Sequence, residues 1–463
     1  ITTVSHVKTS SGDTSNAPTL KMTGSGVIQN LAHEEFLEIN FASGKTLSVE
    51  QAFEVPAGKQ MTITGAAGTL TLGGNMSLTG TLNLAVEDAI LSSGSLTLNG
   101  GLLEVSEDAS ISSAVIQEVS SEFSVATGKT LSYTGSSFNI SAYTLTLSGG
   151  GNFQSGGLDL NNANSKLLLN SITLDSTTTS ANSLGIDVDN DSTITSLSVA
   201  HITPVSIASG KTLSGAITVT AGSLKLNETG TLASSVSMSG GTLDADNSLT
   251  VSGTLTQSGA ITIDVADTKT LTYSGASFSL GANTLTLTGG GTLMSGGLDL
   301  NNADSKLLLN SITVDSVSTT VDNSLGVDVD NDSTITSLSV ANITPVSIAS
   351  GKTLSGAITL TAGSIKLDET GTLASTVEMS GGVLDADESL TVLGALTQSG
   401  DTTIDVLADK TLTYSGAPLS LGPNTLTLSG GGNLVSGGLT LNDASSKLLL
   451  NSITVDNVST SLD

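Results

Sequence analysis

The nonamer SKLLLNSIT occupies Ser165–Thr173, and the chain repeats it unchanged at Ser305–Thr313 and at Ser446–Thr454. The first two copies start 140 residues apart, and the last two start 141 residues apart. A catalytic site is usually needed once in a chain, whereas a building block is needed many times. The constant spacing therefore indicates duplication of a structural unit.

The repeat extends well beyond the nonamer. The stretch NSLGIDVDNDSTITSLSVAHITPVSIASGKTLSGAIT begins at Asn182, and a copy with two substitutions begins at Asn323. The single inserted residue between these copies falls in a polar Ser- and Thr-rich stretch, as expected of a surface loop. We divide the chain into an irregular N-terminal cap or joining segment (1–40), divergent coils (41–128), two long repeat units (129–268 and 269–409) and a partial third unit (410–463).

A shorter period lies within each long unit. Stretches such as Thr284–Leu287 (TLTL) alternate Ser or Thr with apolar residues, and this period of two predicts short β-strands. Gly, Asn and Asp between the strands predict turns. About seven such coils of about 20 residues fill one long unit, and each contains almost no helical pattern.

Two all-β architectures fit short strands, and the sequence favours the parallel β-solenoid, or β-helix. A string of β-sandwich domains needs linkers and large core residues, but aromatic residues make up only 2% of the chain. In a solenoid, small branched side chains stack in ladders inside a narrow core. At about 4.8 Å per coil, roughly 23 coils are expected to form a rod on the order of 110 Å long.

The composition excludes several classes of function. The chain has 463 residues with 42 Asp and Glu against 14 basic residues, all of them Lys, which gives a net charge of −28. Nucleic acids and anionic membrane surfaces attract clustered Lys and Arg, so we expect neither as a partner. No apolar run is long enough to insert into a membrane, and the absence of Cys rules out disulfides.

The two ends of the sequence carry separate expectations. The first residue is Ile, and the last copy stops within a unit, so we expect a processed chain or a piece of a longer array. The stretch GVIQNLAHEEFLEI (Gly26–Ile39) predicts a short helix or a strand pair. A solenoid end needs its open edge covered, so this region is expected to be a cap or to pair with a neighbouring molecule.

The pattern resembles a group of known proteins. SGKTL, AITVTAGSLKL, TLTLSGGGN and GTLTLGGNMSLTGTLNL are similar to stretches in the β-solenoid regions of bacterial secreted and cell-surface proteins. These are filamentous-haemagglutinin-like and autotransporter-like adhesins and very large surface fibre proteins. The resemblance covers nearly the whole chain from about Phe41 and implies an extracellular or cell-surface stalk, adhesin or fibre.

One repeated acidic motif, DVDND, predicts a calcium site. Its alternating carboxylates resemble the first half of an EF-hand loop, but Ser192 replaces the turn Gly and Ser198 replaces the bidentate Glu. A solvated acidic turn competes with this interpretation, and DAD at Asp244–Asp246 and Asp385–Asp387 carries a weaker prediction of the same kind. The candidate ligands are Asp187, Asp189, Asp191, Asp328, Asp330 and Asp332.

Catalysis and ice binding are weaker alternatives. A glycan-cleaving solenoid enzyme needs a unique acid cluster, whereas the acids here repeat with the scaffold and neither Arg nor Trp is present. His201 becomes Asn342 in the next unit, so we expect no enzyme and no catalytic residues. Ice binding needs a regular Thr array, but the outward residues read as a mixture of Ser, Asp, Lys and Asn.

The remaining repeated residues have structural interpretations. Tyr133, Tyr273 and Tyr414 recur with the repeat and predict core packing, as do Phe138 and Phe278. The lysines of SGKTL are expected at turns, where they can pair with carboxylates of adjacent coils.

Together these observations predict a structural protein, a rigid acidic extracellular rod in a surface fibre, filament or adhesin stalk. The expected partners are other copies joined end to end or a longer chain, and a host or neighbouring cell surface. A calcium-responsive or glycan-binding adhesin region is the alternative. No cofactor is required in either case, although calcium is a candidate ligand.

Overall fold

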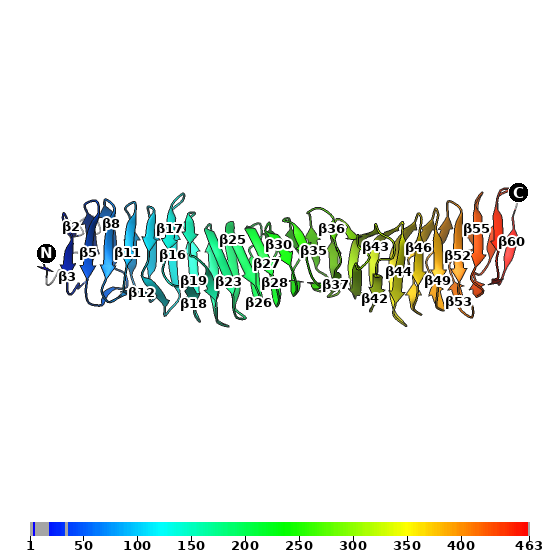
Figure 1. Cartoon of the computed structure of the whole chain (residues 1–463), viewed down its shortest axis with the longest axis horizontal. Coiled ribbons are helices and arrows are strands. Elements are labelled where there is room, and N and C mark those ends of the chain that lie inside the picture. Colours follow the sequence, from blue (N-terminus) through cyan, green and yellow to red (C-terminus); the bar gives the residue numbers. More distant parts are fainter. Residues whose placement is uncertain (1–2, 5–17, 33–35, 462–463) are drawn as a thin grey trace. The chain divides into compact units, whose positions relative to one another are not determined.

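The computed structural model describes residues 3–4, 18–32 and 36–461, and 58% of these residues are in strands. The chain divides into two compact units, Ile1–Ser235 and Val236–Asp463, and in each unit the strands stack as parallel turns (Figure 1). In the described part of the chain, no helix has the length and apolar character required to cross a membrane. The all-β prediction is confirmed.

One turn consists of three strands joined by corners. In the first unit, one such turn contains β4 (Phe36–Phe41), β5 (Lys45–Val49) and β6 (Phe53–Val55). The next turn contains β7 (Gln60–Gly65), β8 (Gly68–Leu72) and β9 (Asn75–Leu78). Each strand of the first turn pairs in parallel with the matching strand of the next, β4 with β7, β5 with β8 and β6 with β9. This pairing repeats over about 22 turns in the two units together, and successive turns are about 20 residues apart in the sequence. Each unit is therefore a parallel β-solenoid.

The core is a set of stacked aliphatic ladders. In the second unit, Leu285 lies opposite Leu307, which lies opposite Val327 in the following turn, and all three side chains are fully buried. The strict alternation predicted from the sequence places every second side chain inside. Burial of these side chains stabilises each turn by contact with the turns on both sides.

The nonamer forms one strand and one corner. It contributes β22 (Lys166–Asn170), β40 (Lys306–Asn310) and β58 (Lys447–Leu450) in its three copies. The serine after the Asn bends the chain in the left-handed region, with φ of 57° at Ser171 and 59° at Ser311. From β40, seven successive parallel pairings lead to β58, which confirms the predicted long repeat of seven coils.

One long strand in each unit carries a glycine at a register shift. Both β27 (Thr212–Val219) and β45 (Thr353–Leu360) shift register against the preceding strand just after Gly215 and Gly356. The φ of Gly356 is 119°, and a Cβ there would lie 1.8 Å from the Ile335 carbonyl oxygen. Only glycine fits this position, which explains SGAIT in both copies.

The repeated aromatic residues lie in the core, as predicted. Tyr133, Tyr273 and Tyr414 are at most 6% exposed. The hydroxyl of Tyr273 accepts the Leu255 N–H at 3.3 Å, and Tyr414 and Tyr133 accept equivalent amides. A buried tyrosine therefore satisfies an amide of the preceding turn in each repeat.

The N-terminal region already follows the solenoid register. The described part of Gly26–Ile39 forms β3 (Gly26–Ile28) and the start of β4, and these strands pair in parallel with β5 and β7. The sequence predicted either a short helix or a strand pair for this stretch, and its described part forms strands. His6 and His33 lie outside the described residues, as do residues 1–2, 5–17 and 33–35 of the predicted cap.

Candidate functional site

The outward side chains of the solenoid segregate by side, and one side carries ion pairs. We call the side formed by β22, β24 (Gly185–Asn190), β40 and β42 (Gly326–Val329), with the strands that continue this ladder, the charged face. The nonamer lysines lie here, where the Lys166 ammonium is 2.5 Å from the Asp187 carboxylate. Lys306 and Asp328 repeat this contact at 2.5 Å.

Further ion pairs also join consecutive turns. Lys129 and Lys410, which precede Thr-Leu as the lysines of SGKTL do, pair with Glu107 and Glu388. All of these side chains are partly exposed, so each pair contributes little to the free energy of unfolding. Their role is to offset carboxylate repulsion between turns.

The DVDND motif does not assemble into one cluster. Asp187 pairs with Lys166, Asp189 is exposed, and Asp191 accepts the Thr212 backbone N–H at 2.9 Å. The second copy repeats this arrangement, with Asp328 paired to Lys306, Asp330 exposed and Asp332 accepting the Thr353 N–H at 2.8 Å. Across residues 3–4, 18–32 and 36–461, no three His, Asp or Glu side chains are grouped so that they could hold a metal. Calcium binding stays a prediction that this geometry does not support.

A different set of aspartates is built into the fold. The Asp315 carboxylate on β41 (Thr313–Thr319) accepts the Ser295 N–H at 3.0 Å and the Ser295 hydroxyl at 2.7 Å. It also accepts the Gly296 N–H at 2.9 Å. Burial alone would raise the pKa of Asp315, but these hydrogen bonds outweigh it and hold the pKa below its usual value.

This carboxylate clamp occurs in all three repeats, at Asp175, Asp315 and Asp456. Asp456 accepts the same donors from Ser436 and Gly437, and its pKa is lowered for the same reason. Sequence reasoning missed the clamp. The signal was present, because Ser-Gly-Gly stands 20 residues before each of these aspartates.

The adjacent side of each turn is uncharged along two rows of hydroxyl groups. In the second unit, one row joins Thr270, Thr292, Thr313, Thr334 and Ser355 through direct strand register. A second row joins Thr353, Thr372, Thr391 and Thr413. We call these the hydroxyl rows. The sequence alone suggested that Ser, Asp, Lys and Asn are mixed among the outward residues. The hydroxyl rows show that this is not the case on every side of the turns.

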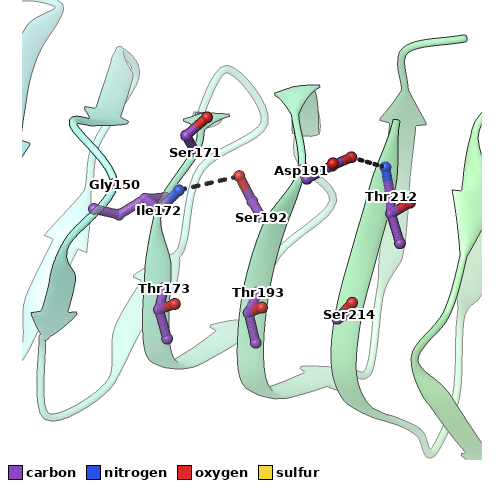
Figure 2. Close-up of a pocket in the computed structure, with 9 residues that line it drawn as sticks. All are labelled: Gly150, Ser171, Ile172, Thr173, Asp191, Ser192, Thr193, Thr212 and Ser214. Atoms are coloured by element: carbon purple, nitrogen blue, oxygen red, sulfur yellow. Dashed lines mark hydrogen bonds between the residues drawn. The ribbon is translucent and has the colours of Figure 1, made fainter. Parts of the chain in front are cut away.

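A shallow hollow lies on the corresponding row of the first unit. Figure 2 shows Thr173, Thr193 and Ser214 on three consecutive strands, with Asp191 at the rim beside Thr212. The hollow has a volume of about 270 Å³. Thr313, Thr334 and Ser355 line an equivalent hollow of about 270 Å³ in the second unit.

The hollows offer hydroxyl groups for hydrogen bonding, with one aspartate carboxylate at the edge of each. The Ser192 hydroxyl accepts the Ile172 N–H and donates to the Asn190 carbonyl, so it is occupied within the fold (Figure 2). The Asp191 carboxylate already accepts the Thr212 N–H. The remaining threonine hydroxyls can donate to and accept from a flat polar surface.

His201, the described histidine, is exposed at a turn and lies outside the hollow. Its counterpart Asn342 donates its side-chain amide to the Thr319 carbonyl at 3.0 Å, so this position links two consecutive coils in the second unit.

No protein-family model, no curated protein and no solved structure matches this chain.

Proposed function

We propose that this chain is a structural rod of the cell exterior, a segment of a surface fibre or an adhesin stalk. The observation that carries the proposal is the unbroken register of the turns. From β40 to β58, each strand of the charged face pairs in parallel with the next, and the aliphatic ladders follow the same register. Backbone hydrogen bonds between turns resist extension along the stack, because many must break together.

The net charge and the resemblance support different parts of this proposal. A net charge of −28 keeps neighbouring molecules apart and soluble, which suits a role in spacing. The resemblance of the repeats to bacterial surface solenoids supports the location outside the cell. The proposed partners are further copies or a longer chain joined end to end, and a host or neighbouring cell surface at the far end of the fibre.

Electron microscopy of the native material tests this proposal. Continuous thin fibres with an axial repeat near 34 Å, the length of seven turns at about 4.8 Å, would support a filament. Isolated rods attached to an envelope or bearing a knob would support an adhesin stalk. Compact particles without an axial repeat would contradict both forms of the proposal.

The hydroxyl rows favour a glycan-binding adhesin region as a second candidate. A neutral polysaccharide surface would meet hydroxyl groups there, with the carboxylates of Asp191 and Asp332 at the edges of the two hollows. The test is co-sedimentation with insoluble neutral polysaccharides, comparing Thr313→Asp/Thr334→Asp with Thr286→Asp/Thr403→Asp on the charged face. Binding that only the first pair abolishes would support this candidate, and equal sedimentation of all three proteins would argue against it.

A further inference from the structure

Two carboxylates face each other across neighbouring turns of the second unit. Asp385 lies on β49 (Val383–Ala386) and Asp405 on β52 (Thr402–Val406), and the strand register places them directly opposite each other. Both side chains are on the outer, half-buried side of their strands. Neighbouring strands are about 4.8 Å apart, so two ionised groups in this position repel each other.

The surrounding groups do not neutralise this pair. Lys366, on β46 (Ser364–Leu367), lies opposite Asp385 in the preceding turn, but its ammonium bonds to Asp387 at 3.0 Å. Beyond Asp405, Ser429 on β55 (Thr425–Ser429) donates its hydroxyl to the Asp405 carboxylate. One lysine therefore faces three carboxylates, and the ladder is left with an excess of negative charge.

The pKa of Asp385 responds to this arrangement. Burial raises the pKa of its carboxyl most, the charges of Asp387 and Asp405 raise it further, and Lys366 lowers it. The result is a pKa of about 6.

We propose that Asp385 and Asp405 share one proton in mildly acidic solution, and that this proton fastens β49 to β52. The proton comes from solvent and binds Asp385, whose O–H then donates to the Asp405 carboxylate. Asp405 keeps its hydrogen bond from Ser429. A repulsive contact between turns becomes a charge-assisted hydrogen bond, so the stack tightens when the medium acidifies.

The sign follows from linkage. The folded state binds the proton more tightly than the unfolded chain, so the stabilisation is full below the unfolded pKa near 4 and is lost as the pH rises through about 6. Between pH 5 and pH 8 this group alone is expected to change the unfolding equilibrium constant about tenfold.

The arrangement occurs twice in this unit. Asp244 on β31 (Thr242–Ala245) lies directly opposite Asp264 on β34 (Ile261–Val265). Asp264 accepts the Thr288 hydroxyl at 2.9 Å, as Asp405 accepts that of Ser429. In both copies, a hydroxyl group on the following turn donates to the second carboxylate of the pair. The acidic pair is therefore a repeated feature of the ladder.

The test compares the full chain with Asp385→Asn, Asp405→Asn and the control Asp330→Asn, an exposed carboxylate outside the ladder. Chemical unfolding is measured at pH 5 and pH 8. Asp385→Asn is expected to remove the roughly tenfold contribution, Asp405→Asn to reduce it, and Asp330→Asn to leave the wild-type pH dependence unchanged. Wild-type pH dependence in both ladder variants would overturn the proposal.

Amide hydrogen exchange provides a second measurement that does not require reversible unfolding. After correction for intrinsic rates, peptides covering 383–406 of the wild type should exchange more slowly at pH 5 than at pH 8. Peptides covering 298–319 serve as the internal reference. Equal protection of 383–406 at both pH values would overturn the proposal even if a variant failed to fold.

Discussion

Two sets of repeated aspartates in this chain differ in what they contact. The clamp aspartates, represented by Asp315, receive backbone and side-chain hydrogen bonds from the preceding turn. The central aspartates of DVDND, represented by Asp330, are exposed. Both sets recur with the same long period. Repetition of an acidic motif therefore does not show whether its carboxylate is structural or solvated. The presence of backbone N–H groups that donate to the carboxylate does show it.

Removal of the clamp should give the largest effect. Asp315→Ala leaves two backbone N–H groups and the Ser295 hydroxyl without their acceptor, so the free energy of unfolding should fall by about 2–3 kcal/mol. Chemical denaturation measures the change. The matched control is Asp330→Ala, which should change the free energy of unfolding by no more than about 0.5 kcal/mol. Equal effects from the two substitutions would remove the distinction between the two sets.

Acid should weaken the clamp, because its carboxylates take up protons in the unfolded chain more readily than in the folded state. The pKa values of Asp315 and Asp456 are lowered in the folded state, so the clamp's stabilisation is full above the ordinary pKa near 4. It is lost as the pH falls through the folded values. Unfolding followed from pH 5 down to pH 2 should show a steeper loss in the wild type than in Asp315→Asn. Parallel curves would contradict the assigned protonation states.

The nonamer ion pair should contribute less. Lys306 and Asp328 are each about a quarter to a third exposed, so a double-mutant cycle with Lys306→Met and Asp328→Asn should give a coupling energy of about 0–1 kcal/mol. High salt should reduce the coupling further. A coupling energy above about 2 kcal/mol would mean that the charged face stabilises the stack more than its exposure allows.

Calcium should give the smallest effect. The carboxylates of DVDND are engaged separately, so adding calcium to EDTA-treated protein is expected to leave the unfolding midpoint unchanged. Thermal unfolding with and without the ion measures this. A stabilisation that Asp189→Asn/Asp330→Asn abolishes would establish the motif as a calcium site after all.

Much of the fold could be predicted because the repeat and the two-residue alternation are local patterns. The alternation at Thr284–Leu287 reappears as the buried and half-buried pattern of its strand, β37 (Thr284–Thr288). The conformation of the corner within each nonamer could not be predicted, because nothing in the sequence shows that Ser311 adopts positive φ. That conformation depends on the turns packed against it.

The candidate site was harder to predict, because contacts between turns depend on register. Thr334 and Ser355 become neighbours only through the pairing of β43 (Ser333–Val340) with β45, whose register shifts just beyond them. The sequence shows both residues but not which side of a turn they share. The hydroxyl rows, the clamp and the facing pair Asp385 and Asp405 all required that register.

The parallel register also has a consequence for how the chain reaches its final form. Leu354 pairs with Leu373, and Leu384 pairs with Ile404, so these strands find their partners about 20 residues away in the sequence. A finished turn presents a template for the next one, and loop closure over so short a distance costs little entropy. A chain released gradually from one end, as during synthesis or passage through a pore, can therefore fold one turn at a time while the remainder is still extended.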